Sequence, residues 1–544
     1  MNTRQLQTDK NQKLYHALLG ILLVCALAMM MLLSYWACKY SYYGAVDGRT
    51  RGVLVGDKTW AHIAVFLAAS ICAMGIDKVL MKKDKSQQEK ICLCTLIVTS
   101  VIAFILGVFY VCKNPYYPVG DQINTTAFAA YCRDGNFSML SIGGYVGMYQ
   151  QQKGLAILYE ILFTLFGDFN YRPAKILHVV WWILTILAGY GFLKLNTDRP
   201  VFRMLYCVMM LGCFPLLFYL PYIYGDVLSI SFGIILFYGV AAYEHSGQKR
   251  YIALASFAAG LAVLARKNTW IVLVAVAVYV LLVSLRKKKV RYLMAGTAIL
   301  LTAALSVKAV DVIYEVRSGY PSGVGIPSIL WVAMGLQETE GRAGVYNRYQ
   351  QATFTDYDCQ QELAAQQGKE YIRERLEEFS QDPGMAFNFF KNKVEGQWIE
   401  PMYAALESTE SFEEGAELSP VLESLYYGEL GRTIWKLTNY YQSILYLAGL
   451  MALVMLGILW WKKKEVPISL WLPWIAVFGG FLFSILWEAK SRYVFPYCVF
   501  MILYAPEGLY QTGLLLCKLP KLRKFKKSGH TQDKGEEASL RETA

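Results

Sequence analysis

The sequence has few charged residues and few histidines. Charged residues make up 17% of the 544 positions, hydrophobic residues make up 56%, and there are five His. Because soluble domains are usually about a quarter charged, this composition excludes an ordinary soluble protein. The His are scattered, and the Cys-x-Cys at 92–94 has no second pair at metal-ligand spacing. We therefore expect no metal site, and the sequence shows no repeat of fixed period.

The hydrophobic residues occur in long blocks. Many blocks reach the ~20 residues that an α-helix needs to cross a bilayer. They are unbroken runs and not alternating strands, so the crossings are expected to be helical. The sequence thus predicts an all-α polytopic membrane protein with about 12 transmembrane helices, at residues 14–35, 60–81, 91–111, 173–193, 203–222, 227–243, 251–265, 269–285, 292–312, 442–461, 467–487 and 493–516.

The apolar block 154–167 is too short to cross and has Glu160 in its middle. If it lies flat on the outer surface, basic clusters such as 286–291 and 518–527 all face the cytoplasm, as the positive-inside rule requires. If it crossed, every later loop would face the other way. We therefore expect a multi-pass protein of the plasma membrane with both termini in the cytoplasm. The net charge of +12 then reflects these loops, and no nucleic acid partner is expected.

The longest polar segment, 313–440, contains 20 Asp and Glu but 10 Lys and Arg, which suits an outer position. It is rich in helix formers, and Asp382–Pro383 is a typical helix start. We expect five regions: 1–90 with two transmembrane helices; 91–312, a membrane module with the outer loop 112–172; 313–441, a helical extracytoplasmic segment; 442–516, the C-terminal transmembrane helices; and 517–544, a cytoplasmic tail, first basic and then disordered.

Charged and aromatic residues gather in four short stretches that this topology places outside. The candidates are Asp121 in "YYPVGDQIN", Tyr224 and Asp226 in "LPYIYGDVLS", Arg266 and Lys267 in "RKNT", and Glu488, Lys490 and Arg492 in "WEAKSRYVFPY". Charged groups near a bilayer usually mark a substrate path. A carboxylate can take a proton from a hydroxyl as a general base, while cations stabilise the charge that develops on a departing phosphate.

Each of these features also has a purely structural interpretation. Asp121 and Asp226 could cap helices, because Asp is favoured at helix N-termini. The cations could reach toward lipid headgroups, and the tyrosines could belong to an interfacial aromatic belt. The Asp-x-Asp at 356–358 is typical of metal-dependent transferases, but in this acidic stretch a solvated loop is the simpler interpretation.

From about residue 91 to 515 the chain resembles the GT-C glycosyltransferases, in particular the protein O-mannosyltransferases and aminoarabinose transferases (glycosyltransferase family 39). In that family one membrane helix leads into an outer loop that holds a catalytic Asp and two helices lying along the membrane. The stretches "YYPVGDQINTTAFAAYCRDG" and "YQQQKGLAILYEILFTLFGDFNYRPAK" resemble these helices. Arg172 matches the Arg at the start of the next membrane helix, "RKNT" the basic turn, and "EAKSRYVFPY" the late motif.

The resemblance implies a GT-C-like bundle and an inverting transfer of a sugar from a polyprenyl phosphate donor on the outer face. Asp121 would be the base, and the substrate-binding residues would be Arg172, Tyr224, Asp226, Arg266, Lys267, Glu488, Lys490 and Arg492. No cofactor is implied, since the lipid-linked sugar is a substrate, and the acceptor is a lipid, a glycan or a protein. The sequence departs from the family pattern at Gln122, where the family commonly has Glu, and in its two additional N-terminal helices.

Other classes of function stay open. A transporter or flippase of a lipid-linked or small polar substrate would also have about a dozen helices, although no repeat is evident and Asp77 is the one clear acid within a predicted crossing. A polyprenyl-diphosphate glycan ligase or polymerase would use similar outer cations. A structural membrane scaffold is the third alternative.

Overall fold

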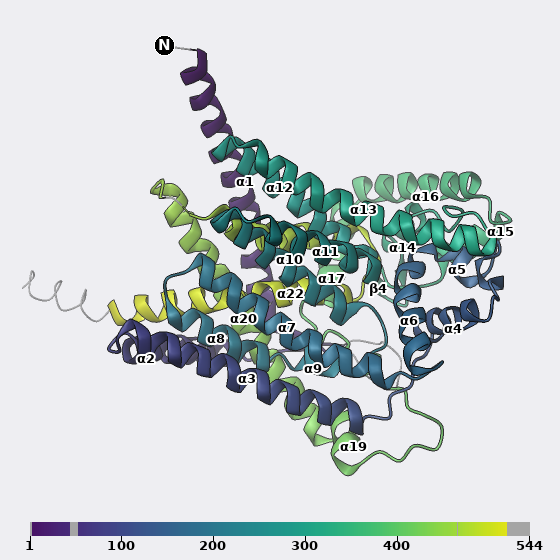
Figure 1. Cartoon of the computed structure of the whole chain (residues 1–544), viewed down its shortest axis with the longest axis horizontal. Helices are drawn as coiled ribbons and strands as arrows, with labels where there is room; N and C mark the ends of the chain where they lie inside the picture. Colours follow the sequence, from purple (N-terminus) through teal and green to yellow (C-terminus); the bar gives the residue numbers. More distant parts are fainter. Residues whose placement is uncertain (1–2, 44–52, 465, 519–544) are drawn as a thin grey trace, which may run out of the picture.

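The computed structural model describes residues 3–43, 53–464 and 466–518, and within them the chain is nearly all α-helical (Figure 1). The described strands form two small antiparallel pairs: β1 (Tyr40–Tyr43) with β2 (Val53–Gly56), and β3 (Glu338–Thr339) with β4 (Arg342–Ala343). From position 519 onward, the tail predicted for 517–544 lies outside the described residues.

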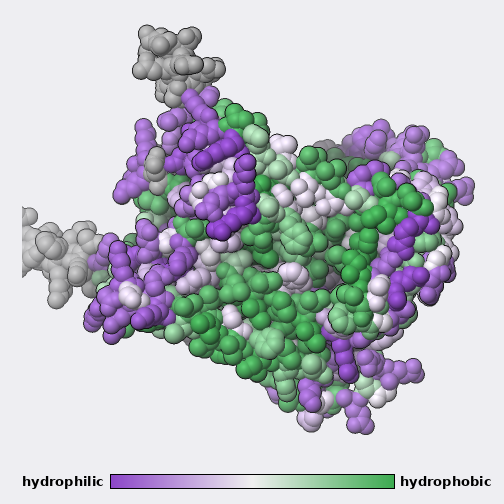
Figure 2. Space-filling model, viewed as in Figure 1, coloured by the Kyte–Doolittle hydropathy of each residue, from purple (hydrophilic) through white to green (hydrophobic). Residues whose placement is uncertain are grey.

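Within the described ranges, nine helices are long and apolar enough to cross a membrane. They are α1 (Thr3–Lys39), α2 (Thr59–Leu80), α3 (Lys85–Lys113), α7 (Arg172–Asn196), α10 (Asp226–Ser246), α12 (Trp270–Lys287) continuing η3 (Lys267–Thr269), α13 (Val290–Ser318), α20 (Glu429–Trp461), and α21 (Leu472–Leu486) continuing η4 (Ile468–Trp471). In Figure 2 hydrophobic surface covers the middle of the molecule and hydrophilic residues gather at both ends. The chain is thus a multi-pass helical membrane protein.

The other three predicted crossings are shorter or interrupted. The segment 203–222 divides into α8 (Pro200–Leu211) and α9 (Phe214–Phe218), because Pro215 stands in the first turn of α9 and cannot continue the preceding helix. Helix α11 (Lys249–Ala265) has 17 residues. In the last segment, α22 (Ser491–Met501) ends at a turn before a second helical stretch, 505–518. For these segments the count of twelve crossings stays a prediction.

The loop 112–172 folds into short helices at one end of the bundle. They are α4 (Asp121–Arg133), η1 (Ser138–Leu140), α5 (Tyr145–Met148), η2 (Gln150–Gln152) and α6 (Lys153–Phe166). Helix α6 has 14 residues, which extend about 21 Å and fall short of the ~30 Å hydrocarbon core. Glu160, in the middle of α6, accepts hydrogen bonds from Arg317 (2.6 Å) and Tyr314 (3.2 Å) of α13. An ion pair therefore fixes α6 against a membrane helix.

The segment 313–440 is helical, as predicted, and its elements are α14 (Ile329–Gly335), α15 (Tyr349–Asp356), α16 (Gln361–Gln381), α17 (Pro383–Trp398), α18 (Ala405–Ser408) and α19 (Pro420–Tyr427). The expected start of α17 is confirmed, because the Asp382 side chain accepts a 2.9 Å hydrogen bond from the Met385 backbone N–H. In Figure 1, α14–α16 lie at the same end as α4–α6, and the basic turn between α2 and α3 lies at the opposite end.

The first two helices are joined to the rest of the bundle and to the segment 313–440. Helix α1 packs along α20, and the Tyr42 backbone N–H of β1 donates a 3.0 Å hydrogen bond to the carbonyl of Ile399. At the start of α2, the His62 ring lies 2.8 Å from the Ser443 hydroxyl and 3.9 Å from the Asp57 carboxylate. Since Ser443 is fully buried, this Ser–His–Asp arrangement is structural.

The placement of the two ends on opposite sides of the membrane can be tested by cysteine labelling. In a background without native cysteines, Asp134→Cys at the end of α4 should react with a membrane-impermeant maleimide added to intact cells. Lys289→Cys, between α12 and α13, should react after the cells are opened. Both positions are exposed, so access to the side chain is not the limiting factor. Labelling of Lys289→Cys in intact cells would contradict the topology.

Candidate functional site

A close backbone contact brings Asp226 next to Arg266. Asp226 is the first residue of α10, and Arg266 follows the last residue of α11. Between them Gly225 touches the end of α11, where a Cβ on Gly225 would lie 1.9 Å from the Ala265 carbonyl oxygen. Any larger residue at Gly225 would push the turn away from Arg266, so the glycine is a requirement of this arrangement.

Two arginines from distant parts of the chain share the Asp226 carboxylate. A guanidinium nitrogen of Arg266 lies 3.4 Å from one carboxylate oxygen, and Nε of Arg492 lies 3.9 Å from the other. The side chains of all three residues are almost completely removed from solvent, with exposed fractions of 12% or less. A buried charge is costly unless it is paired, so Asp226 makes it possible to hold two cations here.

Tyrosine rings hold the two guanidinium groups from their sides. The Arg266 guanidinium carbon lies 4.9 Å from the ring centre of Tyr224 and 5.5 Å from that of Tyr493. The Arg492 guanidinium carbon lies 5.4 Å from each of these rings and 5.2 Å from Tyr222. At such distances the negative faces of the rings attract the cations. The arginines are therefore fixed in place from two directions.

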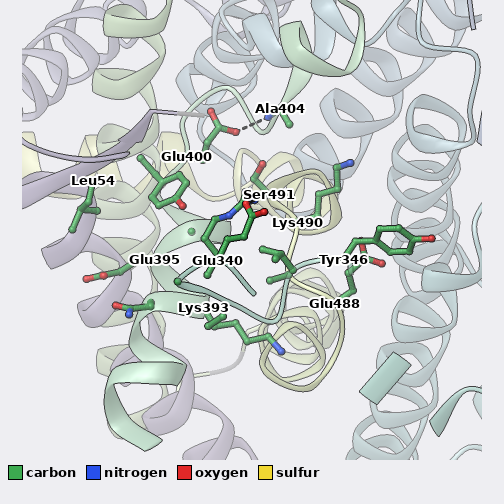
Figure 3. Close-up of a pocket in the computed structure, with 18 of the residues that line it drawn as sticks. Leu54, Glu340, Tyr346, Lys393, Glu395, Glu400, Ala404, Glu488, Lys490 and Ser491 are labelled. Atoms are coloured by element: carbon green, nitrogen blue, oxygen red, sulfur yellow. Dashed lines mark hydrogen bonds and ion pairs between the residues drawn. The ribbon is translucent and has the colours of Figure 1, made fainter. Parts of the chain in front are cut away.

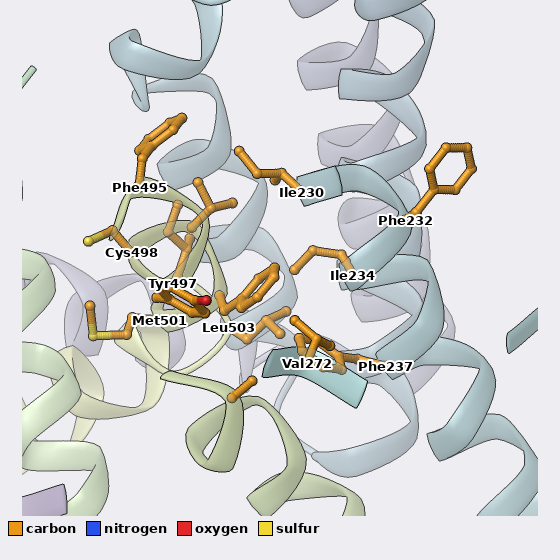
Figure 4. Close-up of a cluster of buried hydrophobic side chains, with 14 of the residues drawn as sticks. Ile230, Phe232, Ile234, Phe237, Val272, Phe495, Tyr497, Cys498, Met501 and Leu503 are labelled. Atoms are coloured by element: carbon orange, nitrogen blue, oxygen red, sulfur yellow. The ribbon is translucent and has the colours of Figure 1, made fainter. Parts of the chain in front are cut away.

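A hydrophobic cluster between α10 and α22 fixes the helices that carry Asp226 and Arg492. Its side chains come from α10, α12 and α22 and the turn that follows (Figure 4). Phe237 and Phe500 pack edge to face with ring centres 4.9 Å apart, and a Cβ on Gly233 would lie 2.8 Å from the Phe500 ring. The two helices thus approach closely along their apolar faces, which sets the distance between the charges at their starts.

Asp121 lies at the start of α4 but does not cap that helix with its side chain. The N-cap residue is Gly120, and no side-chain capping bond is present there. The Asp121 carboxylate accepts a 2.9 Å hydrogen bond from the Tyr145 hydroxyl and is exposed. Its charge also acts on Glu488, so the Asp121 carboxylate lies near that buried carboxyl group. The interpretation of Asp121 as a side-chain cap is therefore not supported. A carboxylate in the first turn still interacts favourably with the helix dipole.

Glu488 is a second carboxylate close to the arginines. It is buried, and both of its oxygens lie 3.4 Å from the Tyr493 hydroxyl, which donates to them. Burial raises the pKa of Glu488 to about 7; the charge of Asp121 adds to this rise, while those of Lys490 and Arg266 oppose it. At neutral pH this group can therefore exchange a proton.

The remaining predicted residues lie at different distances from Arg266 and Arg492. Lys267, the first residue of η3, is exposed and lines a small pocket with Arg266, and Lys490 is half-buried with its charge acting on Glu488. Arg172 begins α7, where its exposed side chain faces the charge of Lys175. In the part of the chain that the structure describes, no contact joins Arg172 to the two central arginines.

Two hollows in the protein meet at Glu488. The first, here called the arginine pocket, has a volume of about 110 Å³ and is lined by Gln151, Gln152, Tyr224, Ala265, Arg266, Lys267, Asn268, Ser328, Trp331, Trp487, Glu488 and Tyr493. The second, here called the glutamate cavity, has a volume of about 720 Å³, and its labelled side chains are shown in Figure 3. Of the residues that line either hollow, Glu488 alone lines both.

Sequence reasoning missed several residues of the site. Tyr145 and Tyr493 contact Asp121 and the arginines, but in the sequence they are two of 39 tyrosines and carry no signal of their own. Lys175 did carry a signal, because it is a cation in a predicted membrane helix. It is buried and donates a 2.7 Å hydrogen bond to the carbonyl of Tyr116.

The described residues contain no group of three or more His, Cys, Asp or Glu arranged to hold a metal ion. The Asp-x-Asp at 356–358 lies at the end of α15 and in the turn after it. Comparison with protein-family models, curated proteins and solved structures finds no match to the chain. The function must therefore be argued from the site itself.

The raised pKa of Glu488 predicts a pH-dependent effect of Glu488→Gln on stability. The folded protein binds this proton more tightly than an unfolded chain, whose Glu titrates near 4.5. Wild-type stability should therefore fall as the pH rises from about 4.5 through about 7. Glu488→Gln cannot ionise, so its melting temperature should exceed that of the wild type at pH 8 and match it at pH 5. Glu429→Gln, which removes an exposed carboxylate paired with Arg432, is the control and should not raise stability at pH 8. An equal effect of Glu488→Gln at both pH values would contradict the prediction.

Proposed function

We propose that this protein is a membrane glycosyltransferase that moves a sugar from a polyprenyl phosphate donor to an acceptor on the extracytoplasmic face of the plasma membrane. The observation that carries the proposal is the convergence of Arg266 and Arg492 on Asp226, with the Asp121 carboxylate close by. This combination provides a base for the acceptor and cations for the leaving phosphate. The resemblance to GT-C enzymes points to the same chemistry.

The charge of the site suits a phosphodiester. Three carboxylates (Asp121, Asp226 and Glu488) face four cations (Arg266, Lys267, Lys490 and Arg492), which leaves one positive charge when all are ionised. A sugar linked to a polyprenyl phosphate carries one negative charge. The Nε of Arg492 is buried, makes no hydrogen bond among the described residues and lies 3.9 Å from Asp226. In this proposal the rest of its planar guanidinium binds the phosphate oxygens.

The site also lies where a lipid donor can reach it. Asp226 and Lys267 are the first residues of two candidate membrane spans. The phosphate would thus be bound at the boundary of the apolar part, while the polyprenyl chain stays in the bilayer. Asp226 is buried and its carboxylate is occupied by the two guanidinium groups, so in this proposal it positions the arginines and does not contact the sugar.

In the proposed reaction the acceptor hydroxyl gives its proton to the Asp121 carboxylate. The acceptor oxygen attacks the anomeric carbon of the sugar, and the bond from that carbon to the phosphate oxygen breaks. The polyprenyl phosphate leaves with the electron pair of that bond, and the arginines stabilise its added negative charge. A single displacement of this kind inverts the anomeric configuration. Tyr145, through its hydrogen bond, positions the Asp121 carboxylate.

Purified protein in nanodiscs tests the proposal with a panel of radiolabelled decaprenyl phosphate sugars and the corresponding diphosphates. Transfer to an acceptor, or slow hydrolysis of a monophosphate donor, supports a glycosyltransferase. Reaction of the diphosphates alone indicates a ligase or polymerase. Movement of an intact lipid-linked sugar across a proteoliposome membrane, without bond cleavage, indicates a flippase and would overturn the proposal.

Asp121→Asn should lower the rate of transfer by about 10²–10⁴-fold, because the amide keeps the shape of the side chain but cannot accept the proton. Binding of decaprenyl phosphate should stay within about twofold of the wild type, since the cations are intact. Asp134→Asn, at the other end of the same helix, removes an exposed acid and serves as the control. Turnover of Asp121→Asn near that of the control would show that Asp121 is not the base.

Arg492→Lys should be impaired, because lysine keeps the charge but loses the two-pronged geometry that fits a phosphate. Arg492→Ala should be weaker still, with a loss of about 10²–10³-fold in rate. Arg432→Lys, a change to an exposed arginine, is the matched control. If Lys serves as well as Arg at position 492, the residue is needed only as a cation beside Asp226 and the phosphate role is wrong.

A further inference from the structure

The glutamate cavity is built from segments that lie far apart in the sequence. Its walls come from the two N-terminal strands, the turn between β3 and β4, helix α17, the stretch 400–407 and the stretch 488–491. Figure 3 shows these side chains on several sides of the hollow, from Glu400 at the top to Lys393 at the bottom. A volume of about 720 Å³ is within the range of small-molecule sites, which run from about 300 to 1,000 Å³.

The polar lining of the cavity is rich in carboxyl groups. It contains five glutamates (Glu340, Glu395, Glu400, Glu407 and Glu488) and three cations (Arg342, Lys393 and Lys490). The Glu400 carboxylate accepts hydrogen bonds from the backbone N–H groups of Met402 (2.8 Å) and Ala404 (2.5 Å). Glu395 is 97% removed from solvent, and one of its carboxylate oxygens has no hydrogen-bond partner among the described residues.

This lining suits a ligand with many hydroxyl groups and disfavours an anion. Carboxyl groups accept hydrogen bonds from hydroxyls and amines, while a phosphate or carboxylate on the ligand would add to an existing excess of negative charge. Burial raises the pKa of Glu400 and Glu407 to about 7 and lowers that of Lys393 to about 7. Near neutral pH the cavity can therefore both donate and accept hydrogen bonds. Tyr42 and Tyr346 add aromatic surface to the walls.

Glu488 connects this cavity with the arginine pocket. It is part of both linings, and the charges of Asp121 and Arg266 act on it. A molecule in the glutamate cavity could therefore extend a hydroxyl group past Glu488 toward Asp121. The arginine pocket, with its cations, is the opposite in charge and suits the phosphate of the donor. Two hollows of different chemistry thus meet at Glu488.

We propose that the glutamate cavity binds the acceptor, and that the acceptor is a hydroxyl-rich, non-anionic molecule such as a neutral or amino-bearing sugar of a glycan. This inference rests on the proposed function and names the acceptor class. It also assigns a purpose to the additional N-terminal helices, because they hold β1 and β2, and Tyr42 and Leu54 of these strands line the cavity.

Gly396 allows the cavity to be filled without removing a charged group. It lines the cavity on α17, and a Cβ there meets only the Tyr42 ring, at 3.8 Å. Gly396→Leu should therefore project into the cavity and Gly396→Ala should not. Gly75→Leu is a matched control, because Gly75 lies on α2 with open space around it. Asn392→Trp, at an exposed lining position, narrows the cavity by a second route.

The test uses two measurements on each variant. The first is hydrolysis of the radiolabelled decaprenyl phosphate sugar by purified protein without acceptor. The second is the glycan product, identified by mass spectrometry, that reappears when the variant is expressed in a strain lacking the protein. Gly396→Leu and Asn392→Trp should keep donor hydrolysis within about twofold but lower the product by about tenfold or more. Gly396→Ala and Gly75→Leu should restore the product fully.

The outcomes separate this inference from the proposed function. If the wild type does not consume the donor, the proposed function fails. If the wild type consumes it and both cavity-filling variants form normal amounts of product, the acceptor is not in this cavity. Loss of donor hydrolysis and product together in folded cavity-filling variants would likewise overturn the inference. So would a product in which a phosphate or carboxylate adjoins the newly glycosylated hydroxyl.

Discussion

The candidate site depends on one buried carboxylate placed between two guanidinium groups. Without Asp226, Arg266 and Arg492 would repel each other in a region that water scarcely reaches, and neither could stay buried at a tolerable cost. The surrounding structure serves this contact. Gly225 lets the turn before α10 touch the end of α11, the tyrosines flank the cations, and the cluster around Phe237 and Phe500 fixes the spacing of the helices.

The arrangement also divides the polar end of the bundle by charge. On one side of Glu488 lies a small pocket that contains Arg266 and Lys267, and on the other a larger cavity in which glutamates outnumber the cations. Such a division suits the proposed transferase, because its donor would bring a phosphate and its acceptor a hydroxyl. Glu488 lines both hollows, and the charge of Asp121 acts on it, so in the proposed reaction the proton moves next to this boundary.

Much of this organisation is encoded in local sequence. Long apolar blocks predict membrane helices, the Asp382–Pro383 start predicts α17, and the shortness of 154–167 with Glu160 inside it predicts a helix that does not cross. Arg266 and Arg492 were recognisable as candidates because both are cations at turns that the predicted topology places on one side of the membrane. In contrast, Tyr145 contacts Asp121 across 24 residues of an irregular loop, and Tyr493 and the glutamate cavity depend on contacts between segments hundreds of residues apart. No spacing rule reveals these contacts. Pro215 indicates the break of 203–222 into α8 and α9, but hydropathy averaged over a window does not show this break.

The sequence positions of the charged residues have a consequence for how the protein is made. A chain emerging from the ribosome delivers Asp226 and Arg266 early, and these two can pair as soon as α10 and α11 pack together. Arg492 emerges more than 220 residues later, near the start of the last helical region, and must enter a place already surrounded by tyrosine rings. The site is therefore completed only by the final step of membrane integration. A nascent chain that stops before α22 has a paired Asp226 but lacks the second cation, so assembly of the whole bundle is a condition for bringing the two arginines together.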